Sequence, residues 1–254
     1  HDVLDVDEMS RVEVDDDWLF IILRVPIAGI NKEQELPYFT IPLGVLIPKG
    51  KNFFLTVCMK ENETIGDIIN NRLKNIDLAN RNNFILTLFL RSAVYYLRFL
   101  KDINRQTTII EKNLETTLKS SELSVLFSYE KSLVYFMTSL KVNELLVQKI
   151  QGSRYARIGE EERDLIDDIL VEHKEAIELA NIYSNILGGM MESFGSFISN
   201  HLNTYIKRLT TITIILMIPT LFASLYGMNV PLPWHDNGNA LLYIGGLCAA
   251  SALV

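Results

Sequence analysis

Cysteine and histidine are scarce in this sequence, and neither is spaced for chemistry. The 254 residues include two cysteines, Cys58 and Cys248, which provide neither a disulfide framework nor a metal-ligand spacing. Four histidines are scattered without a ligand motif: His1, His173, His201 and His235. A nucleotide-binding loop and a Ser/His/Asp or Cys/His constellation are also lacking. These absences argue against an enzyme, and a net charge of −7 disfavours a nucleic-acid partner.

Charge is missing altogether from one long stretch near the C-terminal end. No Asp, Glu, Lys or Arg occurs between Arg208 and Asp236, and residues 209–228 read LTTITIILMIPTLFASLYGM. At about 1.5 Å rise per residue, this stretch spans roughly 30 Å as a helix, the thickness of a bilayer core. The core helix of a soluble protein rarely loses all charge for so long. We therefore predict a first membrane-spanning helix over residues 209–229.

The flanking residues predict an orientation and a second span. Lys207 and Arg208 precede the apolar stretch, which places that end in the cytoplasm and residues 230–239 in an external loop. A second apolar run over 240–254 reaches only about 22 Å, too short to cross, so we expect the chain to stop inside a second membrane helix. We also expect a piece of a longer protein, since it begins at His1. The predicted location is the cell (inner) membrane, multi-pass, with a cytoplasmic N-terminal domain.

The N-terminal part predicts a small sheet. An acidic start is followed by three β-rich runs, Asp17–Val25, Tyr38–Ile47 and Asn52–Met59. Pro48-Lys49-Gly50-Lys51, between the second and third runs, is typical of a hairpin turn.

Beyond Asn62 the pattern becomes helical, with almost no Gly or Pro until Gly152. We predict helices over Glu63–Leu73, Asn82–Ser120 and Glu122–Ile150, the last two as an antiparallel pair. The second predicted helix carries its apolar residues at helical spacing: Leu86, Leu90, Val94, Leu97 and Leu100. The expected fold class of residues 1–150 is therefore an α+β cytosolic domain, a small sheet with helices.

A single long helix is predicted next. From Glu160 the helical pattern meets no proline before Pro219, and a continuous helix to Met228 would extend about 100 Å. No compact soluble domain needs such a rod, so we interpret 151–208 as an acidic stalk that continues into the first membrane helix. Periodic apolar positions suggest that it packs against copies of itself: Leu165, Ile169, Ile177, Ile182, Ile186 and Met190.

The predicted first span ends on a short motif, Tyr226-Gly227-Met228-Asn229. A Gly-Met-Asn triplet alone is weak, but here it ends a charge-free helix, a Pro-containing loop and a second apolar segment follow, and a long acidic helix precedes. This arrangement resembles the CorA family of magnesium channels, whose hallmark is YGMN at the end of the first of two membrane helices. The resemblance covers nearly the whole chain. It implies a funnel-shaped homopentamer, in which the first span lines the pore and the second faces lipid.

The resemblance implies a selectivity filter at Gly227, Met228 and Asn229. Magnesium dehydrates reluctantly, so a ring of Asn229 amides that binds its first-shell waters suits the ion without holding it too long. A helix C-cap is the alternative interpretation of Gly and Asn at this position. Helical spacing back from Asn229, together with the family pattern, indicates these pore-lining positions: Asn203, Ile206, Leu209 (or Thr210), Thr213, Met217, Thr220 and Ser224. The threonines could instead only bond to their own helix backbone.

Acidic residues crowd the start of the stalk. The segment from Glu160 to Glu178 contains nine acidic and two basic residues. Such a run is by default a solvent-exposed side of a helix. The resemblance implies that cytosolic Mg²⁺ bound between subunits holds the closed state. The candidate ligands are Asp164, Asp167 and Asp168, paired with Asp15, Asp16 or Asp17 of a neighbouring subunit.

Three functions stay open at this point. The first is a channel for hydrated Mg²⁺ that also passes Co²⁺ or Ni²⁺, with membrane lipid, divalent cations and its own copies as partners. The second is a Zn²⁺ transporter of the same superfamily, which the intact Met228 disfavours. The third is a membrane-anchored scaffold protein, which would tolerate Asn229→Ala.

Overall fold

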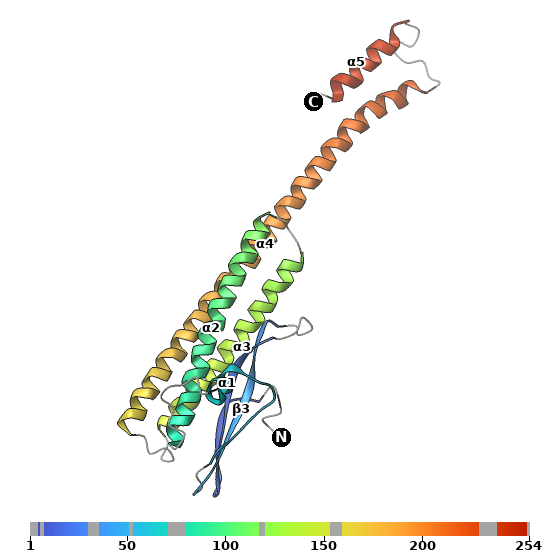
Figure 1. Ribbon diagram of the computed structural model, residues 1–254. Helices are drawn as coiled ribbons and strands as arrows, with labels where there is room; N and C mark the ends of the chain where they lie inside the picture. The colour runs from blue at the N-terminus through green and yellow to red at the C-terminus, as the bar shows by residue number, and fades with distance from the viewer. Residues whose placement is uncertain are drawn as a thin grey trace. The chain divides into compact units, whose positions relative to one another are not determined.

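The chain forms two compact units, His1–Met191 and Glu192–Val254 (Figure 1). The structure is a computed structural model that describes residues 5, 8–29, 36–50, 53–70, 80–116, 120–152, 159–228 and 238–252. The domain limits predicted from the sequence stay predictions.

A four-stranded antiparallel sheet in the order β1-β2-β3-β4 lies in the first unit. The strands are β1 (Arg11–Val14), β2 (Trp18–Ala28), β3 (Tyr38–Pro48) and β4 (Leu55–Cys58). The three predicted runs are confirmed, with shifted ends, and β1 is an additional strand within the acidic start. The predicted turn is confirmed at Lys49 and Gly50, where Gly50 has a φ of 75°, a conformation that favours glycine.

Both faces of the two central strands are covered. Odd-numbered residues 21–27 of β2 and 41–47 of β3 join one hydrophobic cluster with residues of the helices. The alternating residues face the other side of the sheet, and they include Arg24, whose side chain is only 5% exposed. A strand buried on both faces explains why the apolar runs were almost continuous.

Five helices follow the sheet among the described residues. They are α1 (Glu63–Ile69), α2 (Arg81–Thr116), α3 (Ser120–Gln151), α4 (Glu160–Tyr226) and α5 (Ala240–Ala252). Helix α1 begins at Asn62, whose side chain accepts a hydrogen bond from the Ile65 amide at 3.0 Å. It ends before Asn70, earlier than predicted, and Leu73 lies outside the described residues.

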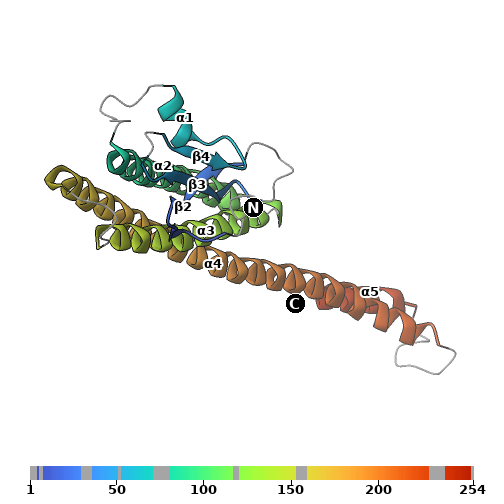
Figure 2. The same cartoon turned by 90° about the horizontal axis from the view of Figure 1, so that it is seen from below.

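The long helix pair is confirmed, with two corrections. Helices α2 and α3 run in opposite directions beside the sheet (Figures 1 and 2). Ser120 begins α3 and does not end α2. Val94 points to solvent, whereas Leu86, Leu97 and Leu100 are buried.

Arg24 docks the sheet onto α3. Its Nε donates to Thr40 Oγ1 and to Ser139 Oγ, each at 3.1 Å. The Asn143 side chain accepts from the Arg24 backbone N–H at 3.0 Å and donates to the Arg24 carbonyl oxygen at 2.8 Å. Asn143 therefore pairs both backbone groups of a residue that lies on a buried strand.

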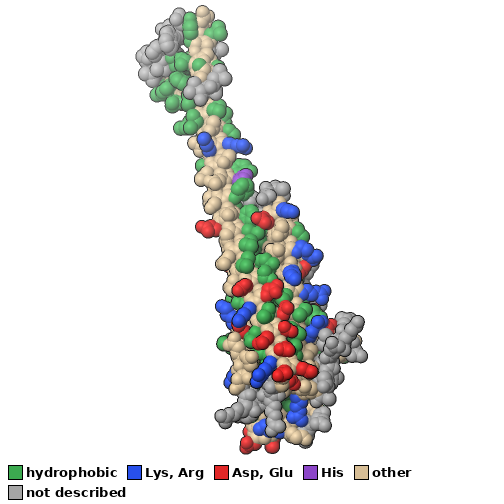
Figure 3. Space-filling model, turned by 90° about the vertical axis from the view of Figure 1, so that its left-hand side faces the viewer, with side chains coloured by type: hydrophobic (Ala, Val, Ile, Leu, Met, Phe, Trp, Pro, Cys, Tyr) green, Lys and Arg blue, Asp and Glu red, His purple; other side chains and the backbone are tan. Residues whose placement is uncertain are grey.

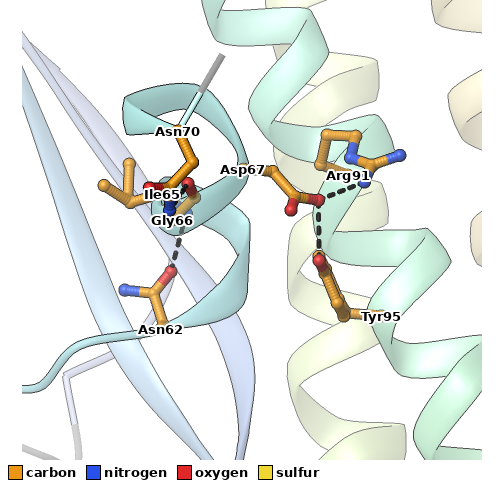
Figure 4. A network of polar contacts seen from close by, with 7 residues as sticks. All are labelled: Asn62, Ile65, Gly66, Asp67, Asn70, Arg91 and Tyr95. Atoms are coloured by element: carbon orange, nitrogen blue, oxygen red, sulfur yellow. Dashed lines mark hydrogen bonds and ion pairs between the residues drawn. The ribbon is translucent and has the colours of Figure 1, made fainter. Parts of the chain in front are cut away.

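A second polar network ties α1 to α2. Arg91 forms an ion pair with Asp67, and Tyr95 donates from its hydroxyl to the same carboxylate oxygen at 2.6 Å (Figure 4). Asp67 is buried, so both partners compensate its lost hydration. Burial raises the pKa of Tyr95, and the hydrogen bond to Asp67 raises it further.

The first part of α4 belongs to the core of the first unit. Ile166 and Ile169 are fully buried and join the hydrophobic cluster. Of the apolar positions expected to pack between copies, Ile169 is thus buried within its own chain, and only Ile182 and Ile186 are largely exposed, at 50% and 46%. The predicted apolar stripe therefore combines a surface that packs within the chain, at Ile169, with a surface that is exposed, at Ile182 and Ile186.

Candidate functional site

The predicted filter stands at the end of α4. Helix α4 stops at Tyr226, the Gly227 amide donates to the Ala223 carbonyl at 3.0 Å, and the Met228 amide donates to the Leu225 carbonyl at 3.3 Å. These bonds close the last turn, as expected of a helix C-terminus. Asn229 lies outside the described residues, so its role stays a prediction.

Helix α5 lies alongside α4 in the second unit (Figure 1). Cys248 Sγ of α5 donates to the Pro219 carbonyl oxygen of α4 at 3.8 Å. The half-buried residues of α4 around this contact lie at helical spacing: Ile218, Pro219, Phe222 and Tyr226. These four residues define the α5-facing side of α4.

The seven predicted pore-lining residues occupy the opposite side of α4. Successive residues of a helix turn by about 100°, which puts their stripe about half a turn from the α5-facing side. All seven are exposed in this chain, including Ile206 at 59%, Leu209 at 66% and Met217 at 67%. A continuous side of mixed Thr, Asn, Ile, Leu and Met side chains is therefore left open.

The threonines of the stripe bond to their own helix. Thr213 Oγ1 donates to the Leu209 carbonyl at 2.8 Å, and Thr220 Oγ1 donates to the Leu216 carbonyl at 2.7 Å. Thr210, the alternative to Leu209, does the same with the Ile206 carbonyl at 2.8 Å. Bonding of the threonines to their own helix backbone is the alternative interpretation given above. Each of these hydrogen bonds uses only the proton of the threonine hydroxyl. The oxygen lone pairs remain available to accept hydrogen bonds.

Helix α4 has the character of a membrane span. Within the described ranges, it is the one helix long and apolar enough to cross a membrane, and the apolar stretch is not buried by the rest of the chain. Pro219 lies inside that stretch and provides no N–H for the carbonyl one turn earlier, which loosens the helix at this point.

The candidate regulatory acids are exposed, and they do not form a metal site within the described part of one chain. Asp164, Asp167 and Asp168 lie in the first turns of α4. Asp15, Asp16 and Asp17, which precede β2, are exposed too, and Lys49 donates to the Asp15 carbonyl at 2.6 Å. Throughout the described part of the chain, no three His, Cys, Asp or Glu side chains gather in a way that could hold a metal ion. Acidic side chains crowd one face of the first unit (Figure 3).

Glu162, one of the acids at the start of α4, has a structural role. Asn80 Nδ2 donates to Glu162 Oε1 at 3.0 Å, and the Gly159 amide donates to Glu162 Oε2 at 2.8 Å. The hydrogen bond from Asn80 lowers the pKa of the Glu162 carboxyl. Glu162 thus fixes the start of α4 beside the segment that enters α2.

His173 is a buried polar group that the sequence did not indicate. It lies on α4 without solvent exposure, its Nδ1 is 2.8 Å from the Ile169 carbonyl oxygen, and its ring faces Phe89 of α2. No group in the described part of the chain forms a hydrogen bond with its Nε2. Burial lowers the pKa of His173 to about 4, so the ring is neutral at neutral pH.

Comparisons with known proteins agree with this architecture. A family model described as CorA-like Mg²⁺ transporter protein matches residues 1–254. The chain is 27% identical over 246 residues to the cobalt/magnesium transport protein CorA of Methanocaldococcus jannaschii, covering 92% of this chain and 73% of that protein.

Two solved structures share the fold. The complete CorA magnesium transporter of M. jannaschii matches with a TM-score of 0.80 at 23% identity, over 99% of this chain and 78% of that one. The cytoplasmic domain of ZntB from Vibrio parahaemolyticus matches with a TM-score of 0.56 at 12% identity, over 80% of this chain and 77% of that one.

Proposed function

Because this chain belongs to the family of CorA-like Mg²⁺ transporter proteins, we propose that it is a homopentameric channel in which α4 lines a pore for hydrated Mg²⁺. The α5 helix then faces lipid. The function also extends to Co²⁺ or Ni²⁺, which resemble Mg²⁺ in charge and hydration. Its location is the cell membrane, with the first unit in the cytoplasm.

The position of α5 is the observation that carries this proposal. It contacts α4 through Cys248 and Pro219, on the side opposite the stripe from Asn203 to Ser224. Polar side chains exposed on a membrane helix are costly in lipid and are usually turned towards other helices or water. Five copies that each turn the stripe inward give the polar residues a water-filled path and leave α5 outside.

The stripe suits an ion that keeps its water shell. Waters bound to Mg²⁺ point their hydrogens outward, and they need acceptors on the wall. Thr213 and Thr220 present lone pairs because their protons are already donated to backbone carbonyls. Met217, Leu209 and Ile206 alternate with them and form apolar constrictions, which close a pore by dewetting.

At the outer end, five Asn229 amides encircle the entrance beyond Gly227 and Met228. Their carbonyl oxygens accept hydrogen bonds from the hydrated ion without adding charge, so the divalent cation can enter and leave.

Closure depends on the exposed acids of the first unit. Asp164, Asp167 and Asp168 of one subunit approach Asp15, Asp16 or Asp17 of the next, and cytosolic Mg²⁺ relieves the repulsion between them. Mg²⁺ favours the closed state if it binds that arrangement better than the open one.

Magnesium uptake into liposomes tests the channel proposal. Asn229→Ala should reduce Mg²⁺ uptake at least about tenfold, since removing a hydrogen bond to a charged group costs roughly 1.5–3 kcal/mol. Asn239→Ala is the matched control, because it removes the same amide near the start of α5. Uptake that survives Asn229→Ala unchanged, in protein that is still inserted and oligomeric, excludes the filter role and favours the scaffold alternative.

A further inference from the structure

An exposed row of side chains runs along α3 in the first unit. Its members follow one another at steps of three and four residues, so they lie on one side of the helix. The row combines apolar and basic side chains: Phe127, Lys131, Val134, Thr138, Lys141 and Leu145. All six are exposed, with Val134 at 50% and Leu145 at 63%. We call this row the basic ridge.

Helix α4 carries a second row with the same spacing and the opposite charge. Its members are also exposed, on the side of α4 away from the buried Ile169: Val171, Glu175, Glu178, Ile182, Ile186 and Gly189. Val171 is 63% exposed and Ile182 is 50% exposed. We call this row the acidic ridge.

The charges of the two ridges are not neutralised within one chain. Lys141 and Glu175 form no ion pair with any residue that the structure describes. Single exposed apolar side chains are ordinary, but here they recur at helical spacing between charges of one sign on each helix. Apolar side chains in register, flanked by opposite charges, are the pattern by which two helices recognise each other.

Contacts within the first unit give the relative heights of its long helices. Helix α3 runs opposite to α2 and α4 (Figure 1). Asn80 of α2 donates to Glu162 of α4 at 3.0 Å, and Phe89 meets His173 at 6.5 Å between ring centroids. A residue of α2 is therefore level with the residue about 82 to 84 positions later, on α4.

Helix α3 is placed on the same scale by one ring contact. The Tyr96 ring of α2 meets the Phe136 ring of α3 at 5.0 Å between centroids. Phe136 is therefore level with about residues 178–180 of α4.

These heights also apply between neighbouring subunits of a closed ring. Rotation about the ring axis keeps each residue at one height, and in the proposed pentamer the axis runs along the helices. Each step back along α3 is a step forward along α4, because the two helices run in opposite directions. Three members of the basic ridge are thus level with three short segments of a neighbouring α4: Val134 with about 180–182, Lys141 with about 173–175 and Leu145 with about 169–171.

Each of these segments holds a complementary member of the acidic ridge. A single register places Val134 opposite Ile182 and Lys141 opposite Glu175. The same register places Leu145 opposite Val171. It does not use the three candidate regulatory acids of α4, which stay free to bind Mg²⁺.

Phe127 provides a fourth match. In this register it lies opposite Gly189, a residue without a side chain. A methyl group added at Gly189 would meet no atom of the described chain within 4 Å, so the space above this glycine is open. A large ring of another copy can occupy that space.

We propose that the basic ridge of one subunit packs antiparallel on the acidic ridge of the next subunit, pairing Val134 with Ile182, Lys141 with Glu175 and Leu145 with Val171. The inference rests on the proposed function for the ring and its axis. A contact between two different surfaces of the same chain is the kind that closes into a ring. It joins the first units to one another along the stalk.

Cysteine pairs in the full-length protein test the register, in a background with Cys58 and Cys248 changed to Ser. Val134→Cys with Ile182→Cys should give disulfide-linked oligomers on non-reducing gels, and so should Leu145→Cys with Val171→Cys. The matched controls exchange the partners: Val134→Cys with Val171→Cys, and Leu145→Cys with Ile182→Cys. These pairs are offset by eleven residues, about 16 Å, whereas a disulfide needs Cα atoms within about 7 Å. They should link at least about fivefold less.

A charge exchange tests the polar pair. Removing one partner of an exposed ion pair has a small effect, so the charges are reversed. Lys141→Glu and Glu175→Lys should each raise the concentration at which the purified oligomer dissociates about fivefold, as measured by native mass spectrometry. The double variant should return to within about twofold of the parent. Lys131→Glu makes the same change on the same ridge, but opposite the neutral Asn185, and should have less than a twofold effect.

Four outcomes would overturn the proposal. Equal linking of matched and exchanged cysteine pairs means that the register is wrong. Strong linking by Ile182→Cys alone means that α4 packs against α4 of another copy. Linking that is absent from a protein still pentameric means that the ridges face elsewhere, and a double charge variant as weak as the single ones means that the two charges do not meet. A protein that forms no oligomer at all would instead also contradict the channel proposal, which Mg²⁺ uptake with Asn229→Ala tests separately.

Discussion

Cys248 Sγ lies 3.8 Å from the carbonyl oxygen of Pro219, and this contact fixes which side of α4 is covered. The opposite side keeps Met217 and Thr220 exposed. In the proposed pentamer, the contact therefore decides which residues of one subunit can meet the same residues of another.

Cross-linking tests this division. In a background with Cys58 and Cys248 changed to Ser, Met217→Cys should form disulfide-linked dimers on mild oxidation, because copies of this position converge on the pore axis of the proposed pentamer. Phe222→Cys, on the α5-facing side, should link far less. Non-reducing gels measure both, and equal linking at the two positions would contradict the proposed pore face.

The proposed role of the acids in gating can be tested by charge removal. Changing Asp164, Asp167 and Asp168 to Ala should leave current flowing at high internal Mg²⁺, because the closed state would lose the Mg²⁺ that we propose bridges the subunits. Changing Glu172, Glu175 and Glu178 to Ala removes the same charge further along the helix and should preserve inhibition. Patch recordings at high internal Mg²⁺ decide the matter, and retained inhibition in the first variant would remove this site.

The junction between the sheet and α3 should depend on Asn143. Asn143→Leu removes the side-chain hydrogen bonds to the backbone N–H and carbonyl of Arg24, although Tyr96 still donates to that carbonyl at 3.2 Å, and the free energy of unfolding should fall by about 1–3 kcal/mol. Gln148→Leu, on the same helix but exposed, is the control and should change it by less than about 0.5 kcal/mol. Denaturant unfolding followed by tryptophan fluorescence measures both, and similar losses would contradict the role of Asn143.

His173 predicts a pH dependence of stability. Its pKa is lowered from 6.5 to about 4 in the folded protein, so the unfolded chain binds more protons between these values. This contribution to stability is complete above about pH 6.5 and is lost as the pH falls towards 4, in total about 3 kcal/mol. Thermal unfolding across this range should show a weaker slope in His173→Leu than in the parent protein. Identical slopes would contradict the buried neutral ring.

Much of the fold could be predicted because its elements follow clear periodicities. The runs that became β2 and β3 are long and apolar, and Gly50 sits at a turn that needs a positive φ. Strand β1 was missed because four residues within an acidic segment provide little pattern. The change from α2 to α3 was misplaced by a few residues because no Gly or Pro marks it.

The site could be predicted less completely, and for a physical reason. A periodic apolar stripe does not say whether its partner is the same chain or another copy, which is why Ile169 and Ile182 were placed in one surface. Buried polar groups are equally hard to recognise in advance. Arg24 did leave a signal, as the lone charge inside an apolar strand, whereas His173 left none.

The bonds from Thr213 and Thr220 to their own backbone have one further consequence for transport. A hydroxyl whose hydrogen is already committed cannot turn to donate to chloride, and it cannot relay a proton along a file of water. A pore lined by such acceptors would favour cations over anions, although the lining side chains are uncharged.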